Sequence, residues 1–160
     1  MNSKDMEKQD VLKEQAFREG PEVHYRAALE KDPDMTNSIA LGMMVRCSAM
    51  TLLDLCGAIF HDFARITVKD FKSHRKLEHH MKALNAGVKM TFNHPKMKGM
   101  KEMTPPIDFE VLFEFGLEFG TCVKSFIMGP LQQLYQYLEK ERALDLLPHA
   151  KYIPLQIDKF

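Results

Sequence analysis

The longest apolar stretch of the chain covers residues 36–63, where apolar side chains recur on nearly every side of a helix. A helix of this kind is either a core helix of a soluble protein or a membrane span. Residues 39–60 are enough to cross a bilayer. However, Arg46 and Asp54 lie inside them, and a charge at the bilayer centre costs about 2.5–3.5 kcal/mol. With charged flanks and a mean hydropathy of −0.29, the pattern predicts a soluble core helix at about 36–65 and no membrane association.

Periodic apolar positions predict further helices on both sides of this segment. Their expected ranges are residues 4–18, 21–31, 67–85, 108–128 and 131–147. The first is mostly polar and is expected to lie at the periphery, within residues 1–20. Thr67 and Asp70 resemble a capping box at the start of the third, and Gly87 is a natural C-terminal stop.

Two segments lack a helical pattern. Residues 93–106 contain Pro, Gly and several lysines without a period, which predicts a lysine-rich loop. Residues 148–160 contain Pro154 among alternating apolar positions, which predicts an extended C-terminal tail. Strand signals are almost absent elsewhere. The sequence therefore predicts one all-α domain over residues 1–160, a bundle of five to six helices around the long apolar helix.

Composition narrows the setting of this domain. The chain has 160 residues, and its 22 basic and 22 acidic side chains balance, so net charge does not indicate nucleic acid. Cys47, Cys56 and Cys122 show no C-x-x-C spacing, which indicates reduced thiols rather than a zinc framework. The first residues carry no apolar core of a secretory signal. We therefore expect an intracellular, cytoplasmic protein.

The charges are unevenly placed along the chain. Residues 61–103 carry ten Lys or Arg against four Asp or Glu, whereas the segments before and after are each net acidic. The pattern predicts a basic helix face, here called the basic surface, formed by Lys69, Lys72, Arg75, Lys76, His79, His80 and Lys82. Such a surface is either simply solvated or a docking site for phosphate, nucleic acid or an acidic partner.

The helix predicted at 108–128 has an acidic and aromatic character. Its candidate binding residues are Phe109, Glu110, Phe113, Glu114 and Glu118. The three glutamates repeat every fourth position, and like charges at that spacing destabilise a helix unless something basic faces them. Phe109, Phe113 and Phe115 cannot all face one neighbour, which favours an interface. A di-metal bundle would require Glu-x-x-His motifs, which the sequence lacks.

Asp54 is the odd residue of the long apolar helix, because three leucines flank it. A buried carboxylate must be paired, hydrogen-bonded or neutral. We therefore expect Asp54 to be buried and bonded to a tyrosine, arginine or lysine on another helix. A role as an active-site carboxylate is the alternative.

The segment LCGAIFHDFARI, an apolar helix that ends in His-Asp, resembles the metal-binding helix of the HD-type phosphohydrolases. The resemblance implies an all-α phosphoesterase in which a divalent metal activates water. It would make His61 and Asp62 metal ligands and His24 the upstream histidine. The distant aspartate of the family would correspond to Asp108 or Asp145.

These observations favour binding over catalysis. The first hypothesis is a small helical binding and assembly module that docks through the basic surface and the acidic-aromatic helix, with itself or another protein. It requires no cofactor. The alternative is the metal-dependent phosphohydrolase, and a third hypothesis is a nucleic-acid accessory protein, although few aromatic side chains accompany the basic surface to stack on bases.

Overall fold

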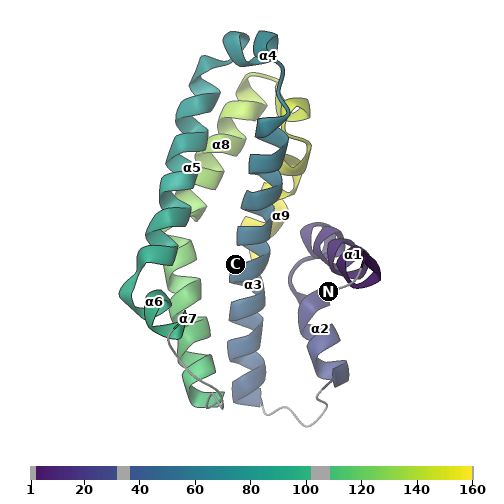
Figure 1. Cartoon of the computed structure of the whole chain (residues 1–160), viewed down its shortest axis with the longest axis vertical. Coiled ribbons are helices and arrows are strands. Elements are labelled where there is room, and N and C mark those ends of the chain that lie inside the picture. Colours follow the sequence, from purple (N-terminus) through teal and green to yellow (C-terminus); the bar gives the residue numbers. More distant parts are fainter. Residues whose placement is uncertain (1–2, 32–36, 102–108, 160) are drawn as a thin grey trace.

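The computed structural model describes residues 3–31, 37–101 and 109–159 (Figure 1). Every regular element within these ranges is helical, and none is a strand. The predicted all-α class is therefore confirmed. The number of helices was underestimated, because the described residues contain nine α-helices and two short 3-10 helices.

The elements follow one another with short connections. Their bounds are α1 Ser3–Glu19, α2 Glu22–Lys31, α3 Asn37–Ala64, α4 Val68–Ser73, α5 Arg75–Asn93, α6 Pro95–Lys101, α7 Phe109–Phe126, α8 Met128–Lys140, η1 Leu144–Leu146, η2 Pro148–Tyr152 and α9 Ile153–Lys159.

The long helix α3 runs along the longest axis of the molecule (Figure 1). It contacts α1, α2, α5, α7, α9 and η2. Leu52, Leu55 and Ile59 of α3 are fully buried. Their spacing of three and four residues places them on one face of the helix, which packs into the main apolar core.

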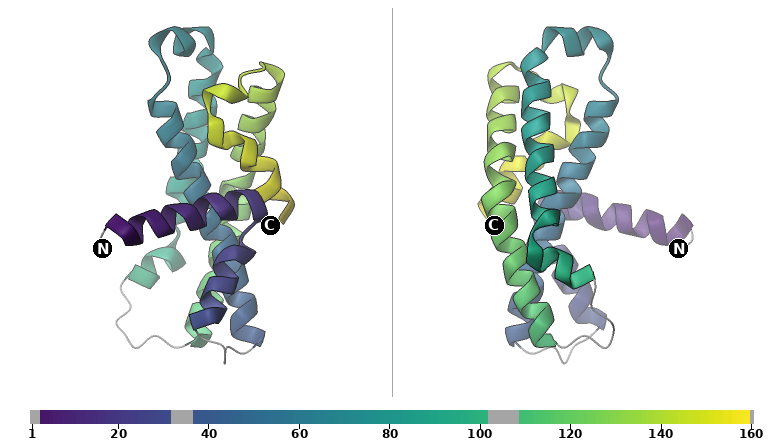
Figure 2. Two further views of the ribbon diagram at one scale, coloured as in Figure 1. Left: turned by 90° about the vertical axis from the view of Figure 1, so that its right-hand side faces the viewer. Right: turned by 60° about the vertical axis from the view of Figure 1, so that its left-hand side comes forward.

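Helix α1 crosses the bundle at a steep angle, and its N-terminal end extends beyond the other helices (Figure 2). Its C-terminal end is anchored, because Ala16 and Phe17 are buried. The side-chain amide of Gln156 on α9 donates to the Ala16 carbonyl at 2.7 Å and to the Phe17 carbonyl at 3.3 Å. Gly20 then adopts a φ of 108°, which a residue with a side chain rarely adopts, and the chain turns into α2.

The predicted extended C-terminal tail is wrong, because residues 148–159 form η2 and α9. Buried Tyr152, Ile153 and Gln156 follow a helical spacing of three and four, not an alternation. Pro148 begins η2 and Pro154 lies in the first turn of α9, where a proline deprives the helix of no hydrogen bond.

The middle of the chain differs from the prediction in two places. The helix expected at 67–85 is two helices, α4 and α5, and α5 continues through Gly87 to Asn93. Thr67 does cap α4, since its hydroxyl oxygen accepts a hydrogen bond from the Asp70 amide. The segment predicted as a loop at 93–106 contains helix α6 over Pro95–Lys101. The rest of that segment after Lys101 lies outside the described residues.

One described helix is long and apolar enough to span a membrane by length and composition alone. It is the part of α3 from Met44 to Ala64, with a mean hydropathy of 1.2. Only 33% of this window is buried within the chain.

Candidate functional site

The basic surface lies mainly on α5. Lys72, Arg75, Lys76 and Lys82 are exposed, as are Lys69 and His79. Lys82 forms an ion pair with Glu78 one turn away at 3.5 Å. His80 is half-buried and stacks against the ring of Tyr137 on α8, with the centroids 4.8 Å apart. Burial lowers the pKa of His80, and the neighbouring His79 and Lys76 lower it further.

The acidic-aromatic helix corresponds to α7. The side chains of Phe109, Glu110 and Phe113 lie outside the described set, although the backbone of all three belongs to α7. Glu114 is exposed. Glu118 is half-buried, and its carboxylate faces Lys96 of α6 at 3.3 Å and His94 at 3.4 Å. A basic group from the same chain therefore answers one member of the acidic line.

Asp54 is half-buried rather than buried, with 31% of its side chain exposed. Its partner is Lys13 of α1 at 3.8 Å, a long ion pair. Burial raises the pKa of Asp54, while Lys13 and His24 lower it by less. The ionised carboxylate is therefore less stable in the folded chain than in the unfolded chain.

This shift predicts the effect of Asp54→Asn. Because the folded pKa is raised, wild-type stability falls as pH rises from the unfolded value through the folded value, and then stays lower. The neutral asparagine side chain carries no such penalty, so the variant should gain stability relative to wild type between about pH 3 and about pH 7. Urea unfolding at both pH values measures the gain. The exposed Asp145→Asn serves as control, and an equal gain in both variants would contradict the assignment.

His24, His61 and Asp62 do not form a group of mutually close ligand atoms in the described chain. His24 is half-buried near Asp54 and Lys13, and burial lowers its pKa. His61 is exposed and lines a cavity of about 650 Å³ between α1 and α3. The Asp62 carboxylate instead binds His149.

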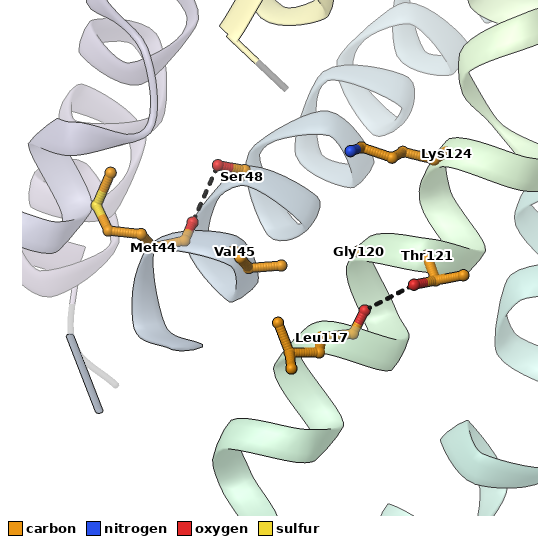
Figure 3. A pocket seen from close by; sticks show the side chains of 7 residues that line it. All are labelled: Met44, Val45, Ser48, Leu117, Gly120, Thr121 and Lys124. Carbon is orange, nitrogen blue, oxygen red and sulfur yellow. Dashed lines mark hydrogen bonds between the residues drawn. The ribbon is translucent and has the colours of Figure 1, made fainter. Parts of the chain in front are cut away.

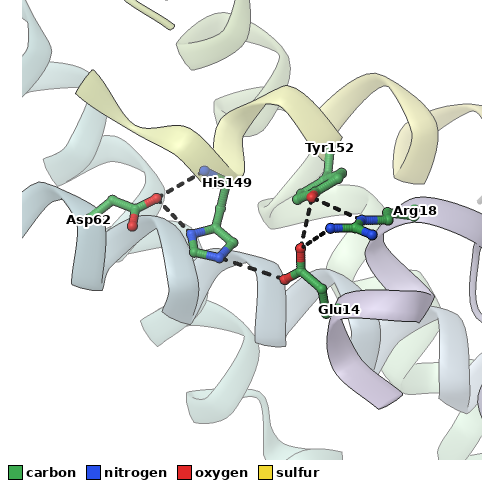
Figure 4. A network of polar contacts seen from close by, with 5 residues as sticks. All are labelled: Glu14, Arg18, Asp62, His149 and Tyr152. Carbon is green, nitrogen blue, oxygen red and sulfur yellow. Dashed lines mark hydrogen bonds and ion pairs between the residues drawn. The ribbon is translucent and has the colours of Figure 1, made fainter. Parts of the chain in front are cut away.

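The contacts of Asp62 join three distant parts of the chain (Figure 4). One carboxylate oxygen accepts from the His149 backbone amide at 2.9 Å and lies 2.8 Å from its Nδ1. The other ring nitrogen of His149 is 3.9 Å from Glu14 of α1. Glu14 also accepts from the Tyr152 hydroxyl at 2.8 Å and pairs with Arg18 at 3.2 Å. We call these five residues the polar staple, because they connect α1, α3 and η2.

Sequence reasoning missed the polar staple. His149 and Tyr152 fell in the segment predicted to be extended, and Glu14 in a helix considered peripheral. The helical spacing of His149, Tyr152 and Gln156 was the available signal, since it places all three on one face.

A second cavity, of about 540 Å³, lies between the N-terminal half of α3 and the facing part of α7, and we call it the α3–α7 groove (Figure 3). Its lining residues are Met44, Val45, Ser48, Leu117, Gly120, Thr121 and Lys124. The hydroxyl groups of Ser48 and Thr121 donate to carbonyls of their own helices, at 2.9 Å and 3.0 Å. These hydroxyl protons are already used, so what the groove offers is chiefly apolar surface and the charge of Lys124.

An exposed stripe runs along α7 beside this groove, and we call it the α7 stripe. It consists of Glu114, Leu117, Thr121 and Lys124, all of them exposed. Their spacings of three, four and three residues place them on one side of the helix. Leu117 is 40% exposed, which makes it one of the few large apolar side chains open to solvent in the described chain.

Comparison with protein family models, with curated proteins and with solved structures found no match to this chain. The functional argument therefore rests on the geometry of its surfaces and side-chain clusters.

Proposed function

We propose that the chain is a helical assembly module, a single bundle organised around α3, and that two copies associate through the α7 stripe and the α3–α7 groove. The observation that carries the proposal is the order of side chains on the α7 stripe. It reads acidic, apolar, small polar and basic from Glu114 to Lys124, and all four side chains are exposed.

This order is self-complementary for two antiparallel helices. Glu114 and Lys124 lie equally far from the midpoint between Leu117 and Thr121. When a second α7 packs with its direction reversed about that midpoint, each Glu114 meets the partner's Lys124 and each Leu117 meets the partner's Thr121. A two-fold interface has this property, because the same patch serves both subunits.

The floor of the groove allows such packing. Gly120 is buried beside Leu117, and a glycine presents no side chain to hold a neighbouring helix away. Met44 and Val45 line the groove from α3, where they are only half-buried. Removing apolar surface from water contributes about 25 cal/mol per Å², so a second copy covering these residues would be stabilising.

The apolar character of α3 is better matched by a protein partner than by a membrane. Arg46 and Asp54 interrupt the apolar window of α3, and Asp54 already pairs with Lys13 of a neighbouring helix. A bilayer would have to accommodate both charges, whereas the polar margin of a protein interface tolerates them. The basic surface on α5 lies outside the α7 stripe and leaves a second site for an acidic partner or nucleic acid.

Charge reversal on the stripe tests the proposal. Glu114→Lys or Lys124→Glu alone should weaken self-association by about tenfold or more, because two-fold symmetry repeats each like-charge contact. The double variant should recover it, since each introduced lysine would then face the introduced glutamate of the other copy. Sedimentation equilibrium over a range of protein and salt concentrations measures the dissociation constant, and salt should weaken wild type more than either single variant.

The matched control is Lys72→Glu with Lys76→Glu, which changes charge on the basic surface and should leave self-association intact. A wild-type chain that stays monomeric at all concentrations would contradict the proposal, as would a double variant as weak as the single variants. A monomer that sediments with lipid vesicles would instead assign the apolar face of α3 to a membrane.

A further inference from the structure

Three potential metal ligands meet where α5, α6 and α7 pack together. They are His94, Glu118 and Cys122, and their ligand atoms all lie within 4.8 Å of one another. The His94 Nε2 and a Glu118 carboxylate oxygen are 3.4 Å apart. Cys122 is buried, whereas His94 and Glu118 remain 29% and 23% exposed.

The local sequence produces this convergence in two ways. Glu118 and Cys122 are four residues apart on α7, so their side chains lie one above the other on the same face. His94 lies between α5 and α6 in an extended conformation, with φ −60° and ψ 135°. Such a conformation is favoured before a proline, and Pro95 begins α6. The break between the two helices directs His94 toward α7.

The separations suit a tetrahedral ion. Zinc bonds to nitrogen, oxygen and sulfur are about 2.0–2.3 Å long, so two ligands of a tetrahedral zinc lie about 3.3–3.6 Å apart. The His94–Glu118 contact already has this separation, and the cysteine sulfur requires a shift of about 1 Å. A mixed set of imidazole, carboxylate and thiolate suits zinc, whereas calcium and magnesium prefer oxygen alone.

We propose that His94, Glu118 and Cys122 form a three-ligand site for one Zn²⁺ ion per chain, with the fourth position open to water. The half-exposed imidazole and carboxylate mark the side from which solvent reaches the ion. An open zinc position of this kind lowers the pKa of bound water and polarises carbonyl or phosphoryl oxygens. The ligand class is thus a borderline-soft divalent cation with an exchangeable coordination position.

Binding requires small changes in the neighbouring groups. The Cys122 thiol must lose its proton to form the zinc–sulfur bond, and burial and Glu118 both raise its pKa. The Lys96 ammonium contacts the second oxygen of Glu118 at 3.3 Å, which leaves the oxygen nearest His94 for the ion. The Lys96 amide donates weakly to His94 Nδ1 at 3.3 Å, so ligation through Nε2 moves the ring proton to Nδ1 and gives up that bond.

This inference is independent of the proposed self-assembly. The α7 stripe uses Glu114 and Leu117, whereas the zinc ligands on α7 are Glu118 and Cys122. The variant Glu114→Lys should therefore lose self-association and keep metal binding, and the two proposals can fail separately.

Cobalt titration of the whole, chelator-treated and reduced chain tests the site, because Co²⁺ replaces Zn²⁺ and reports thiolate ligation by a charge-transfer band in the near ultraviolet. We expect about one Co²⁺ per chain, displacement by one Zn²⁺, and release of about one proton per ion into a weakly buffered solution. Absence of Co²⁺ and Zn²⁺ binding, or a band without proton release, would overturn the proposal.

Single substitutions identify the ligands. Cys122→Ala should abolish the charge-transfer band and weaken binding by about 100-fold or more, whereas the control Cys47→Ala should keep both. His94→Gln is a second ligand variant at a half-exposed position and should also weaken binding by about 100-fold. Circular dichroism confirms that each variant is folded. A band that survives in Cys122→Ala, or unchanged affinity in His94→Gln, would overturn the assignment.

Discussion

Gly87→Ala is expected to destabilise the chain by about 3 kcal/mol or more. A methyl group at Gly87 of α5 would overlap the backbone carbonyl oxygen of Phe126 and lie 3.0 Å from its carbonyl carbon. Phe126 ends α7, and α8 begins two residues later, so α5 passes directly against the junction of two helices. A flexible side chain could move aside, whereas this backbone cannot, and the helices would have to separate.

Gly57→Ala is the matched control for this prediction. Gly57 is exposed on α3, and nothing lies within 4 Å of the position of an added methyl group. Alanine there should stabilise the helix by about 0.5–1 kcal/mol, because glycine loses more backbone entropy on folding. Urea unfolding of both variants measures the difference. Similar stabilities of Gly87→Ala and wild type would show that α5 does not approach the α7–α8 junction this closely.

Asp62→Ala is expected to lower the free energy of unfolding by about 2–4 kcal/mol. Asp62 is 9% exposed and accepts hydrogen bonds from both the backbone amide and the ring of His149. Removing the carboxylate leaves the amide of His149 without this acceptor near the core. The loss should also free the C-terminal segment, because this contact joins residues 87 positions apart.

Tyr152→Phe provides the comparison within the same polar staple. It removes only the hydroxyl that donates to Glu14 and keeps the aromatic ring against Phe17. A loss of about 1 kcal/mol is expected. Urea unfolding measures stability, and amide hydrogen exchange of α9 shows whether the C-terminal segment opens first. If Asp62→Ala changes stability by less than about 0.5 kcal/mol, the staple does not hold this segment.

Local patterns in the sequence predicted the helical class and the long apolar helix, because both depend on spacing within one turn. Residues 36–65 were expected to be helical, and α3 covers Asn37–Ala64. The cap at Thr67 was also readable, since a side chain three residues from its partner amide requires no tertiary contact. Gly87 was misread as a helix stop, because its packing against Phe126 is invisible in the local sequence.

The candidate sites depended on the tertiary structure. Sequence alone marked Glu114 and Glu118 as one acidic line, yet the folded chain gives Glu118 to Lys96 and His94 and leaves Glu114 exposed. It paired His61 with Asp62 as neighbours, although successive helix positions point about 100° apart. Asp62 instead meets His149, and His94 meets Cys122, because packing of distant helices brings together residues that no local period connects.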